Sequence, residues 1–369
     1  MKITRVTPFL VEEVPTSDGW SEGIRVLLVK VEDETGLAGW GEAFALSPRQ
    51  TAIRDIMMIL GEKLMALPEA SPRRFLQDVA AVEDAGHPSI DFDSAVSALE
   101  IALWDLAGKR LGVPVHTLLG GAIRSEVPIY ANAWDSPTQP PEAIAARCAK
   151  MRSEGYRAVK IYPLRQPTLE LTEKLVRLTR EAIGPDADLM LDFAVEPDPR
   201  RALQAARLCA PYNPFWIEEP VSGEDPASMA DFRKRVDMRV TTGERQSGLT
   251  HYRDILSLRA ADVLNPDICG VGGILRMVEI ATMAQAHSVL FSPHNWNSTN
   301  VGFAAMMQVS AVLPNLCYAE LYYDYLELGA RYATTDFVIA NGVATVPTTP
   351  GIGVTIDEGA LRALCVKED

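Results

Sequence analysis

The sequence predicts an α/β protein, a modified closed (β/α)₈ barrel of the TIM type that carries an α+β capping domain. Short apolar runs alternate with amphipathic helical stretches through the middle of the chain, which is typical of a parallel sheet covered on its outer face. Eight such units at regular intervals predict that the sheet closes into a barrel. With 369 residues, 47% of them hydrophobic, the chain also exceeds the size of one ordinary domain.

The amino-terminal third differs from the middle of the chain. Residues 3–14, 24–36 and 37–43 alternate apolar and polar side chains, which predicts a small antiparallel sheet. From about residue 49 to 119 the period is helical. The polar, glycine-containing segment 15–23 lies between the first two strands, and we expect it to form a mobile loop with a functional role.

The longest helix of this part is predicted in the stretch DSAVSALEIALWDLAGKRLG, before Gly112 and Pro114. Its apolar stripe consists of Val96, Leu99, Leu103 and Leu106. We therefore assign residues 1–124 to the capping domain.

The eight apolar runs expected to form the barrel strands are 127–132, 158–163, 189–193, 215–220, 240–244, 261–267, 289–294 and 317–321. They place the catalytic barrel at residues 125–330. The remaining segment, 331–369, begins with a hairpin-like pattern, and we expect it to return to the capping domain.

Composition excludes several classes of partner. The formal net charge of −14 repels nucleic acid and anionic membrane surfaces. Glu12 and Glu13 interrupt the apolar run that a signal peptide needs, and no stretch is long enough to cross a bilayer. The five cysteines form no CxxC pair, which favours a reducing compartment without disulfides. We therefore expect a cytoplasmic protein that binds a small molecule.

Polar residues stand at the end of successive barrel strands, where the chemistry of such barrels resides. They recur at intervals of about 26 residues, so their side chains should converge on one mouth. These residues are Lys160, Tyr162, Asp192, Glu218, Glu219, Glu244, Asp267, His294 and Glu320.

Three of these groups are carboxylates on successive strands, Asp192, Glu218 and Glu244. In a mouth of low dielectric they would repel one another and bind protons unless a cation lay between them. Oxygen ligands without thiolates or clustered imidazoles favour Mg²⁺. The alternative, three unrelated solvated acids, stays open on spacing alone.

Asp267 and His294 end the next two strands, so a contact that fixes the imidazole tautomer and raises its basicity is geometrically reasonable. Taken alone, however, a histidine followed by asparagine is more often a surface or loop-capping residue. Glu320 could equally form a salt bridge in the barrel wall.

The motifs together resemble the enolase superfamily, and within it the mandelate racemase-like subgroup. They are ALWDLAGKRLGVPVHTLLGG in the cap, then WIEEP, TTGE, NPDICGVGGI, SPHN and AEL on successive barrel strands. The resemblance implies that Asp192, Glu218 and Glu244 bind Mg²⁺ and that Asp267 and His294 form a general-base dyad. It implies that Glu320 hydrogen-bonds the substrate carboxylate, that the reaction begins with removal of the proton α to that carboxylate, and that the protein is a homo-oligomer.

Two positions depart from this pattern. Where many relatives have Lys-x-Lys on the second strand, this chain has Lys160-x-Tyr162, and where many have asparagine after the first metal ligand, it has Ala194. Residues i and i+2 of a strand share a face, so Lys160 and Tyr162 should both face the mouth. A phenol with an ordinary pKa of about 10 is a poor base, although we expect Lys160 and a metal to lower that pKa.

Because racemisation needs a competent acid and base on both faces of the substrate, Tyr162 favours dehydration. We expect an acid sugar dehydratase that converts an aldonate or an aldarate, such as the hexarate galactarate, to a 2-keto-3-deoxy acid. Lys160 would neutralise the substrate carboxylate and His294 would be the base or the leaving-group acid. Tyr162 would be an acid/base, a hydroxyl clamp or simply a residue of a barrel layer.

Other functions remain open. A cycloisomerase or racemase of the same superfamily, acting on a carboxylate or lactone, would use the same groups, and a non-catalytic barrel is a remote alternative. The residues that select the sugar are expected in segments 15–23 and 295–300. Arg165 and Arg245 are weak candidates for binding the far end of a diacid.

Overall fold

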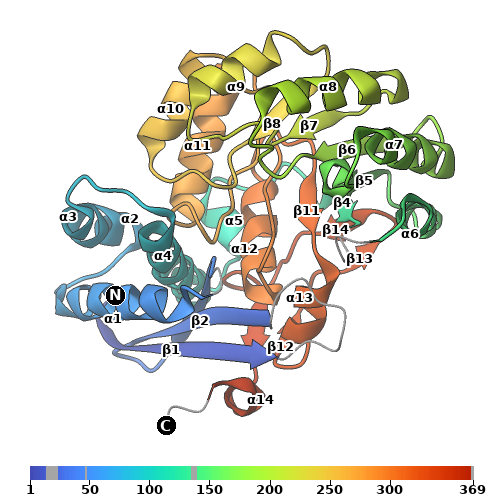
Figure 1. Ribbon diagram of the computed structural model, residues 1–369. Coiled ribbons are helices and arrows are strands. Elements are labelled where there is room, and N and C mark those ends of the chain that lie inside the picture. Colours follow the sequence, from blue (N-terminus) through green and yellow to red (C-terminus); the bar gives the residue numbers. More distant parts are fainter. Residues whose placement is uncertain (14–23, 46–47, 134–138, 367–369) are drawn as a thin grey trace.

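The computed structural model describes residues 1–13, 24–45, 48–133 and 139–366, and the statements below refer to these residues. It has two parts, a barrel with helices on its outside and a smaller layer of sheet and helices beside it (Figure 1). The predicted (β/α)₈ barrel with an α+β cap is therefore confirmed. The predicted loop 15–23 lies outside the described residues.

The cap contains an antiparallel sheet in the order β1-β2-β3, as the alternating pattern predicts. Its strands are β1 (Ile3–Glu13), β2 (Ile24–Asp33) and β3 (Ala38–Ala43). The inward-facing residues of this sheet pack against two long helices, α1 (Gln50–Ala66) and α4 (Ile90–Leu111). Shorter helical segments complete the cap: α2 (Pro72–Phe75), η1 (Leu76–Ala80), α3 (Ala81–Asp84) and α5 (Val115–Leu118).

Helix α4 follows its sequence signals closely. The Ser89 side chain accepts a hydrogen bond from the backbone N–H of Phe92 and so caps the first turn. The helix ends at Gly112, which has a φ of 70° that glycine adopts without strain. The predicted apolar stripe is buried in full. Burial of that stripe against the sheet is what holds the helix in place.

The barrel sheet contains eight consecutive parallel strands among the described residues. They are β4 (Glu126–Asn132), β5 (Ala158–Ile161), β6 (Asp188–Asp192), β7 (Trp216–Glu218), β8 (Arg239–Thr242), β9 (Val263–Leu264), β10 (Leu290–Phe291) and β11 (Ala319–Leu321). From β4 to β10 each strand pairs with the next along the chain, and β11 pairs with β4. A parallel bridge between Phe291 and Leu316 joins β10 to the approach of β11, so the barrel closes.

Helices on the outside connect these strands, as expected for parallel pairing. They are α6 (Pro141–Ser153), η2 (Pro163–Arg165), α7 (Leu169–Ile183), α8 (Pro199–Cys209), η3 (Ala210–Tyr212), α9 (Pro226–Arg233), α10 (Leu249–Ser257), α11 (Ile274–Ala286), α12 (Asn300–Ser310) and α13 (Tyr323–Gly329). None of the described helices is both long enough and apolar enough to span a membrane.

The carboxy-terminal segment contacts both parts. It contains β12 (Ala333–Thr335), β13 (Ile339–Ala340), β14 (Val343–Thr345), β15 (Val354–Ile356) and α14 (Glu358–Leu364). Strand β14 pairs antiparallel with β4 of the barrel, whereas α14 reaches the cap, where Glu358 lies 2.9 Å from Lys30 Nζ. The boundaries 1–124, 125–330 and 331–369 remain our interpretation of the sequence.

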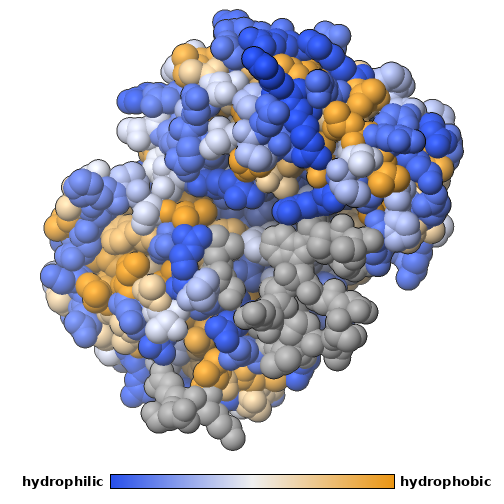
Figure 2. All heavy atoms as spheres, in the orientation of Figure 1, coloured by the Kyte–Doolittle hydropathy of each residue, from blue (hydrophilic) through white to orange (hydrophobic). Residues whose placement is uncertain are grey.

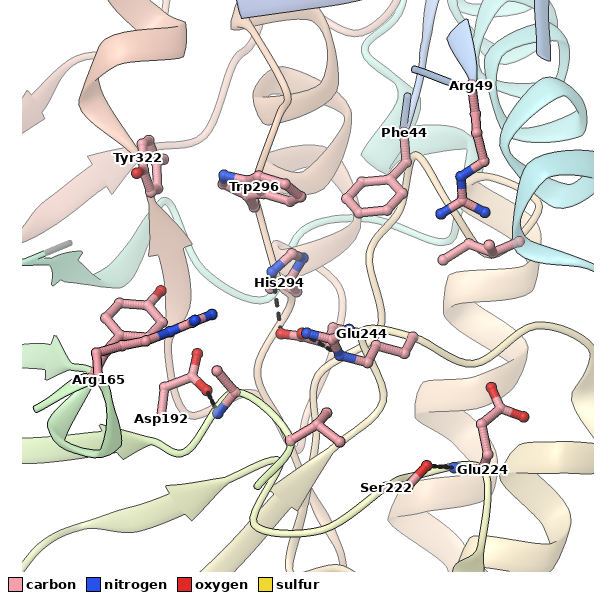
Figure 3. Close-up of a pocket in the computed structure, with 15 residues that line it drawn as sticks. Phe44, Arg49, Arg165, Asp192, Ser222, Glu224, Glu244, His294, Trp296 and Tyr322 are labelled. Atoms are coloured by element: carbon pink, nitrogen blue, oxygen red, sulfur yellow. Dashed lines mark hydrogen bonds and ion pairs between the residues drawn. The ribbon is translucent and has the colours of Figure 1, made fainter. Parts of the chain in front are cut away.

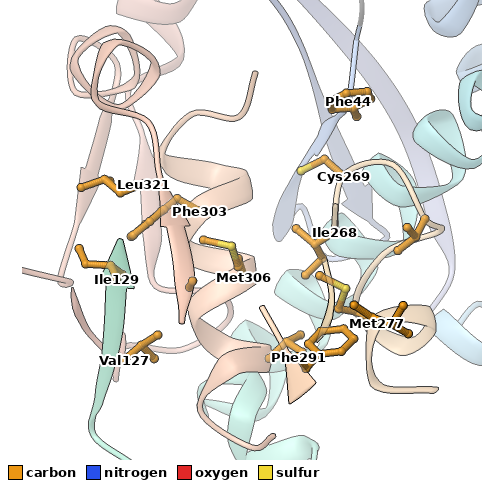
Figure 4. Packing of buried hydrophobic residues seen from close by; sticks show 14 of the residues in the cluster. Phe44, Val127, Ile129, Ile268, Cys269, Met277, Phe291, Phe303, Met306 and Leu321 are labelled. Atoms are coloured by element: carbon orange, nitrogen blue, oxygen red, sulfur yellow. The ribbon is translucent and has the colours of Figure 1, made fainter. Parts of the chain in front are cut away.

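Buried apolar residues form one large cluster around the barrel strands and a second in the cap. Figure 4 shows part of the first, in which Phe44 of the cap lies near Cys269 and Ile268 of the barrel. The two parts are thus packed together on apolar side chains. On the face in Figure 2, mostly hydrophilic residues border a hollow between the barrel helices and the cap.

Two buried carboxylates of the cap hold the amino termini of barrel helices. Glu42 accepts hydrogen bonds from the backbone N–H groups of Thr299 and Gly302, at 2.7 and 2.8 Å, at the start of α12. Glu100 likewise accepts from Ile274 at 2.7 Å at the start of α11. Burial raises the pKa of each carboxyl to about 7 although these donors oppose it. The loops that precede both helices carry site residues, so the cap helps to position the site.

Candidate active site

The polar groups of the site form one layer above an apolar floor inside the barrel. Five strands supply the floor residues, Tyr130, Ala158, Met190, Trp216 and Val263. Two positions further along the same strands stand Asn132, Lys160, Asp192, Glu218 and Asn265, all buried. Because residues i and i+2 point to the same side of a strand, the sequence places this polar layer directly above the floor.

Asp192, Glu218 and Glu244 converge as predicted, with one carboxylate oxygen of each within 4.8 Å of the others. Burial and the neighbouring carboxylates raise the pKa of Glu218 well above its usual value, and that of Asp192 to about 6. A divalent cation would stabilise the ionised form of all three groups. The donor set, carboxylate oxygens alone, suits a hard cation, so the triad is a candidate metal site.

Lys160 is fully buried and lies among the carboxylates. Its Nζ is 2.9 Å from Glu218, 2.8 Å from Glu320 and 3.7 Å from Asp192. Burial alone would lower the pKa of Lys160, but the charges of Glu218 and Glu320 outweigh it and raise that pKa well above the ordinary value. We expected Lys160 to face the mouth together with Tyr162, but Lys160 is absent from the described lining of the pocket and lies beneath it. Its position suits it to hold carboxylates in place.

His294 and Asp267 form the predicted contact. Asp267 Oδ2 lies 2.8 Å from His294 Nδ1, and Asp267 Oδ1 accepts a 2.8 Å hydrogen bond from the Cys269 backbone. These bonds orient the imidazole so that Nε2 faces the pocket, 3.3 Å from Glu244 and 3.6 Å from Glu320. The ring of Phe44 packs edge-on against the imidazole at a centroid distance of 6.3 Å. The imidazole is thus fixed from both sides.

The charge on His294 depends on its carboxylate neighbours. Burial lowers the pKa of His294, but Glu320, Glu244 and Asp267 outweigh it and raise that pKa to about 10. Glu244 responds in the opposite sense: burial raises its pKa, and His294 and Arg245 outweigh that effect and lower it. These carboxylates therefore favour the protonated form of the imidazole.

Adding Mg²⁺ to the metal-free protein should lower the pKa of His294 from about 10 toward neutrality, because a cation held by Glu244 opposes the charge that raises it. Imidazole NMR titrations with and without MgCl₂ measure the shift. Since the folded pKa lies above the ordinary 6.5, metal-free protein should also lose stability as the pH rises toward 10. An identical His294 titration in both samples would contradict a cation at Glu244.

Tyr162 lines the pocket and is tied to the first barrel strand. Its hydroxyl accepts a 2.7 Å hydrogen bond from Asn132 Nδ2, which also donates to Glu320 Oε1 at 2.8 Å. Lys160 lowers the pKa of Tyr162, as expected, but burial, Asp192 and Glu320 dominate and raise it well above the ordinary value. The expected lowering by Lys160 is therefore present, but burial outweighs it and the net pKa of Tyr162 is raised. The Tyr162 side chain is therefore a neutral phenol that keeps its proton.

Glu320 is buried and ionised. Burial would raise its pKa, but Lys160 and His294 outweigh that effect and lower it to about 2. Besides Lys160 and Asn132, the backbone N–H of Asn295 donates to Glu320 Oε2 at 3.1 Å. The salt bridge in the barrel wall that the residue type suggested is therefore present, with Lys160 as partner.

The pocket above these groups has a volume of about 370 Å³ and lies between barrel and cap (Figure 3). The lining residues are Phe44, Arg49, Ile90, Tyr162, Arg165, Asp192, Ala194, Val195, Ser222, Glu224, Glu244, Arg245, His294, Trp296 and Tyr322. The two predicted arginines, Arg165 and Arg245, both line the pocket, and Arg245 pairs with Glu244 at 3.2 Å. A third arginine, Arg49 of the cap, also lines it and pairs with Asp91 at 3.0 Å. The pocket offers a small, charged, partly aromatic space.

Sequence reasoning missed two groups at this site. Asn132 ends the first barrel strand, as the predicted residues end the others, so the same rule could have found it. Arg49 lies in the cap, and no strand-end rule points to it. Ala194 and Val195 line the pocket with φ values of 50° and 61°, which are strained for residues other than glycine.

Fold and site together define the class: a barrel enzyme with carboxylates, a His–Asp pair and a buried lysine under a capping domain. The chain matches the family model "Mandelate racemase / muconate lactonizing enzyme, N-terminal domain" over residues 5–120 and "Enolase C-terminal domain-like" over residues 143–360. The second match covers more than half of the chain. This chain therefore belongs to the mandelate racemase/muconate lactonizing enzyme family of the enolase superfamily, as the motifs predict.

Curated relatives in this family carry two kinds of name. D-gluconate dehydratase of Thermoproteus tenax is 30% identical over 98% of this chain and 73% of its own length. D-galactarolactone cycloisomerase of Agrobacterium fabrum is 31% identical over 98% of each chain. Among solved structures, an enolase from Sargasso Sea shotgun sequencing has 33% identity and a TM-score of 0.94, covering 99% of this chain and 97% of its own. These relatives confirm that the chain is an enzyme of the superfamily.

Proposed function

We propose that this protein is a Mg²⁺-dependent hydro-lyase. It would remove the proton α to the carboxylate of an acid sugar and eliminate the β-hydroxyl, leaving a 2-keto-3-deoxy acid. The observation that carries the proposal is the pair of proton-transfer groups around one pocket, His294 with its Asp267 partner and the Tyr162 hydroxyl, beside three convergent carboxylates. The curated relatives named dehydratases support the same reaction class.

In this proposal His294 Nε2 takes the α-proton while Asp267 stabilises the imidazolium that forms. The electron pair of the C–H bond moves into the substrate carboxylate. It then returns to expel the β-hydroxyl, which takes a proton from His294 or Tyr162 and leaves as water. The enol that remains converts to the 2-keto acid. Mg²⁺ bound by Asp192, Glu218 and Glu244 would withdraw charge from the substrate carboxylate and so lower the barrier to proton removal.

The remaining charged groups hold this arrangement. Glu320 lies 2.8 Å from Lys160 Nζ and accepts a 2.8 Å hydrogen bond from Asn132, so it holds both groups in place. Its hydrogen bond to a substrate carboxylate remains a prediction. Lys160 neutralises Glu218 and Glu320. Its direct contact with a substrate carboxylate remains a prediction, as do a homo-oligomeric state and a cytoplasmic location.

A second candidate, a cycloisomerase acting on a lactone, is favoured by two of the comparisons. The relative named D-galactarolactone cycloisomerase matches nearly the full length of both chains. A solved neighbour named 3,6-anhydro-D-galactonate cycloisomerase, from Zobellia galactanivorans, also covers the whole chain, with a TM-score of 0.90 at 26% identity. Proton removal by His294 would serve this reaction as well.

A panel of aldonates, aldarates and their lactones, tested with Mg²⁺, decides between the two. We expect turnover that EDTA abolishes and Mg²⁺ restores, because the carboxylate cluster requires a cation. Proton NMR in D₂O should show the loss of the signals from the protons on the α- and β-carbons and a new, partly deuterated 3-deoxy methylene signal from at least one acid sugar. Isomerisation of a lactone without loss of water would establish the cycloisomerase instead.

A further inference from the structure

We propose that Asn132 is a positioning residue that orients the Tyr162 hydroxyl as a proton donor toward the substrate. This inference rests on the function proposed above and assigns a role to a residue outside the metal triad and the His–Asp pair. Asn132 ends β4, which lies between β5 with Tyr162 just beyond it and β11 with Glu320. It therefore sits where it can connect both groups.

The direction of the Asn132 amide follows from its neighbours. Its side-chain nitrogen lies 2.8 Å from Glu320 Oε1, an ionised oxygen that only accepts hydrogen bonds. The amide oxygen would be repelled at that position. The nitrogen therefore faces Glu320, and Lys160, 2.8 Å from the same carboxylate, keeps Glu320 charged and in place.

The second N–H of the same nitrogen points at Tyr162. The distance from Asn132 Nδ2 to the phenolic oxygen is 2.7 Å, so that oxygen accepts a hydrogen bond. An oxygen that accepts from Asn132 directs its own proton to a different acceptor, and Tyr162 lines the pocket. The leaving hydroxyl of the proposed substrate is an acceptor of the required kind.

Burial strengthens this arrangement. Asn132 is 8% exposed and Glu320 is fully buried, so water competes little for either bond. Asn132, Tyr162 and Glu320 come from three adjacent elements of a closed barrel, which fixes their relative positions. The amide thus couples the orientation of Tyr162 to the carboxylate that lies 3.6 Å from His294 Nε2.

A double-mutant cycle between Asn132 and Tyr162 tests the proposal. Asn132→Ala should lower kcat about tenfold, with a smaller change in KM, since one oriented hydrogen bond is lost. In the Tyr162→Phe background the same change should lower kcat less than about threefold. Asn132→Leu, which keeps much of the side-chain volume and removes both donors without adding a charge, should behave like Asn132→Ala, and Asn341→Ala on the surface is the matched control. Equal losses in both backgrounds would overturn the proposal.

A spectroscopic measurement separates this inference from the proposed reaction. In protein labelled with ¹³Cζ-tyrosine, the Tyr162 signal is the one missing from Tyr162→Phe, and Asn132→Leu, which removes the donor without adding a charge, should shift it. Tyr130, two positions before Asn132 on β4, reports whether the strand itself is disturbed. An unchanged Tyr162 signal, or equal shifts of Tyr130 and Tyr162, refutes the orienting bond. A wild-type protein inactive on every acid sugar refutes the proposed function whatever this signal shows.

Discussion

Replacement of His294 by asparagine is expected to lower turnover about 10⁴-fold, while the affinity for Mg²⁺ changes little. The imidazole faces the carboxylates through Nε2 and is oriented by a partner, Asp267, through Nδ1. Asparagine fills much of the same space but cannot take up a proton. Turnover of the acid sugar found in the substrate screen and calorimetric Mg²⁺ titration measure the two quantities.

The chain offers a matched control for that variant. His287 lies at the exposed end of α11, where its Nδ1 contacts the Met283 carbonyl at 2.9 Å, so His287→Asn should leave turnover unchanged. If His294→Asn retained full turnover, the base would have to be another group, and Tyr162 would be the next to test. If it lost Mg²⁺ binding as well, the loss of activity would say nothing about proton transfer.

The fold was predictable because the spacing of apolar residues differs between strands and helices. Two-residue alternation in the first part and apolar runs between helices in the second are consequences of which face is buried. The site followed from the same logic, since parallel strands bring their carboxyl ends to one edge and Asp192, Glu218, Glu244, Asp267 and His294 all stand there. Position along a strand was sufficient to bring them together.

The charge state of each site residue was harder to predict, because it depends on how deeply the side chain is buried and on which charges surround it. Lys160 and Tyr162 share a strand face, yet Lys160 is sealed among carboxylates and Tyr162 reaches the pocket. The net pKa of Tyr162 is raised rather than lowered, because burial outweighs the effect of the nearby Lys160 ammonium. The contacts of Glu42 with α12 join residues over 250 positions apart, and no local pattern encodes them.

The site carries more negative than positive charge around the proposed cation. Asp192, Glu218, Glu244 and Glu320 converge in the described structure. The groups of positive charge that lie buried among them are Lys160 and the His294 imidazole. The raised pKa values of Asp192 and Glu218 reflect that excess, whereas Glu320, close to Lys160 and His294, has a lowered one. Glu218 is the triad carboxylate that Lys160 contacts at 2.9 Å, so its replacement disturbs both the proposed cation site and the buried lysine.

Glu218→Gln is expected to weaken Mg²⁺ binding at least about 100-fold and to lower turnover about 10³-fold at subsaturating metal. Glutamine removes one negative charge from the triad. It also sets an NH₂ group against one of the donors that surround the carboxylate, which are Lys160 Nζ and Asn265 Nδ2, both at 2.9 Å, and Trp216 Nε1 at 3.2 Å. Calorimetric Mg²⁺ titration measures the affinity, and turnover at increasing MgCl₂ measures the second effect.

Thermal unfolding is an independent measurement of how Glu218→Gln affects Mg²⁺ binding. Mg²⁺ should raise the Tm of the wild-type protein and raise that of Glu218→Gln far less, because a ligand stabilises only the state that binds it. Glu224→Gln is the matched control, since Glu224 lines the same pocket but lies outside the triad. Equal Tm shifts in wild type and Glu218→Gln would place the cation elsewhere. A loss of the Mg²⁺-induced Tm shift that is confined to Glu218→Gln would instead assign both metal binding and turnover to Glu218, at the end of β7.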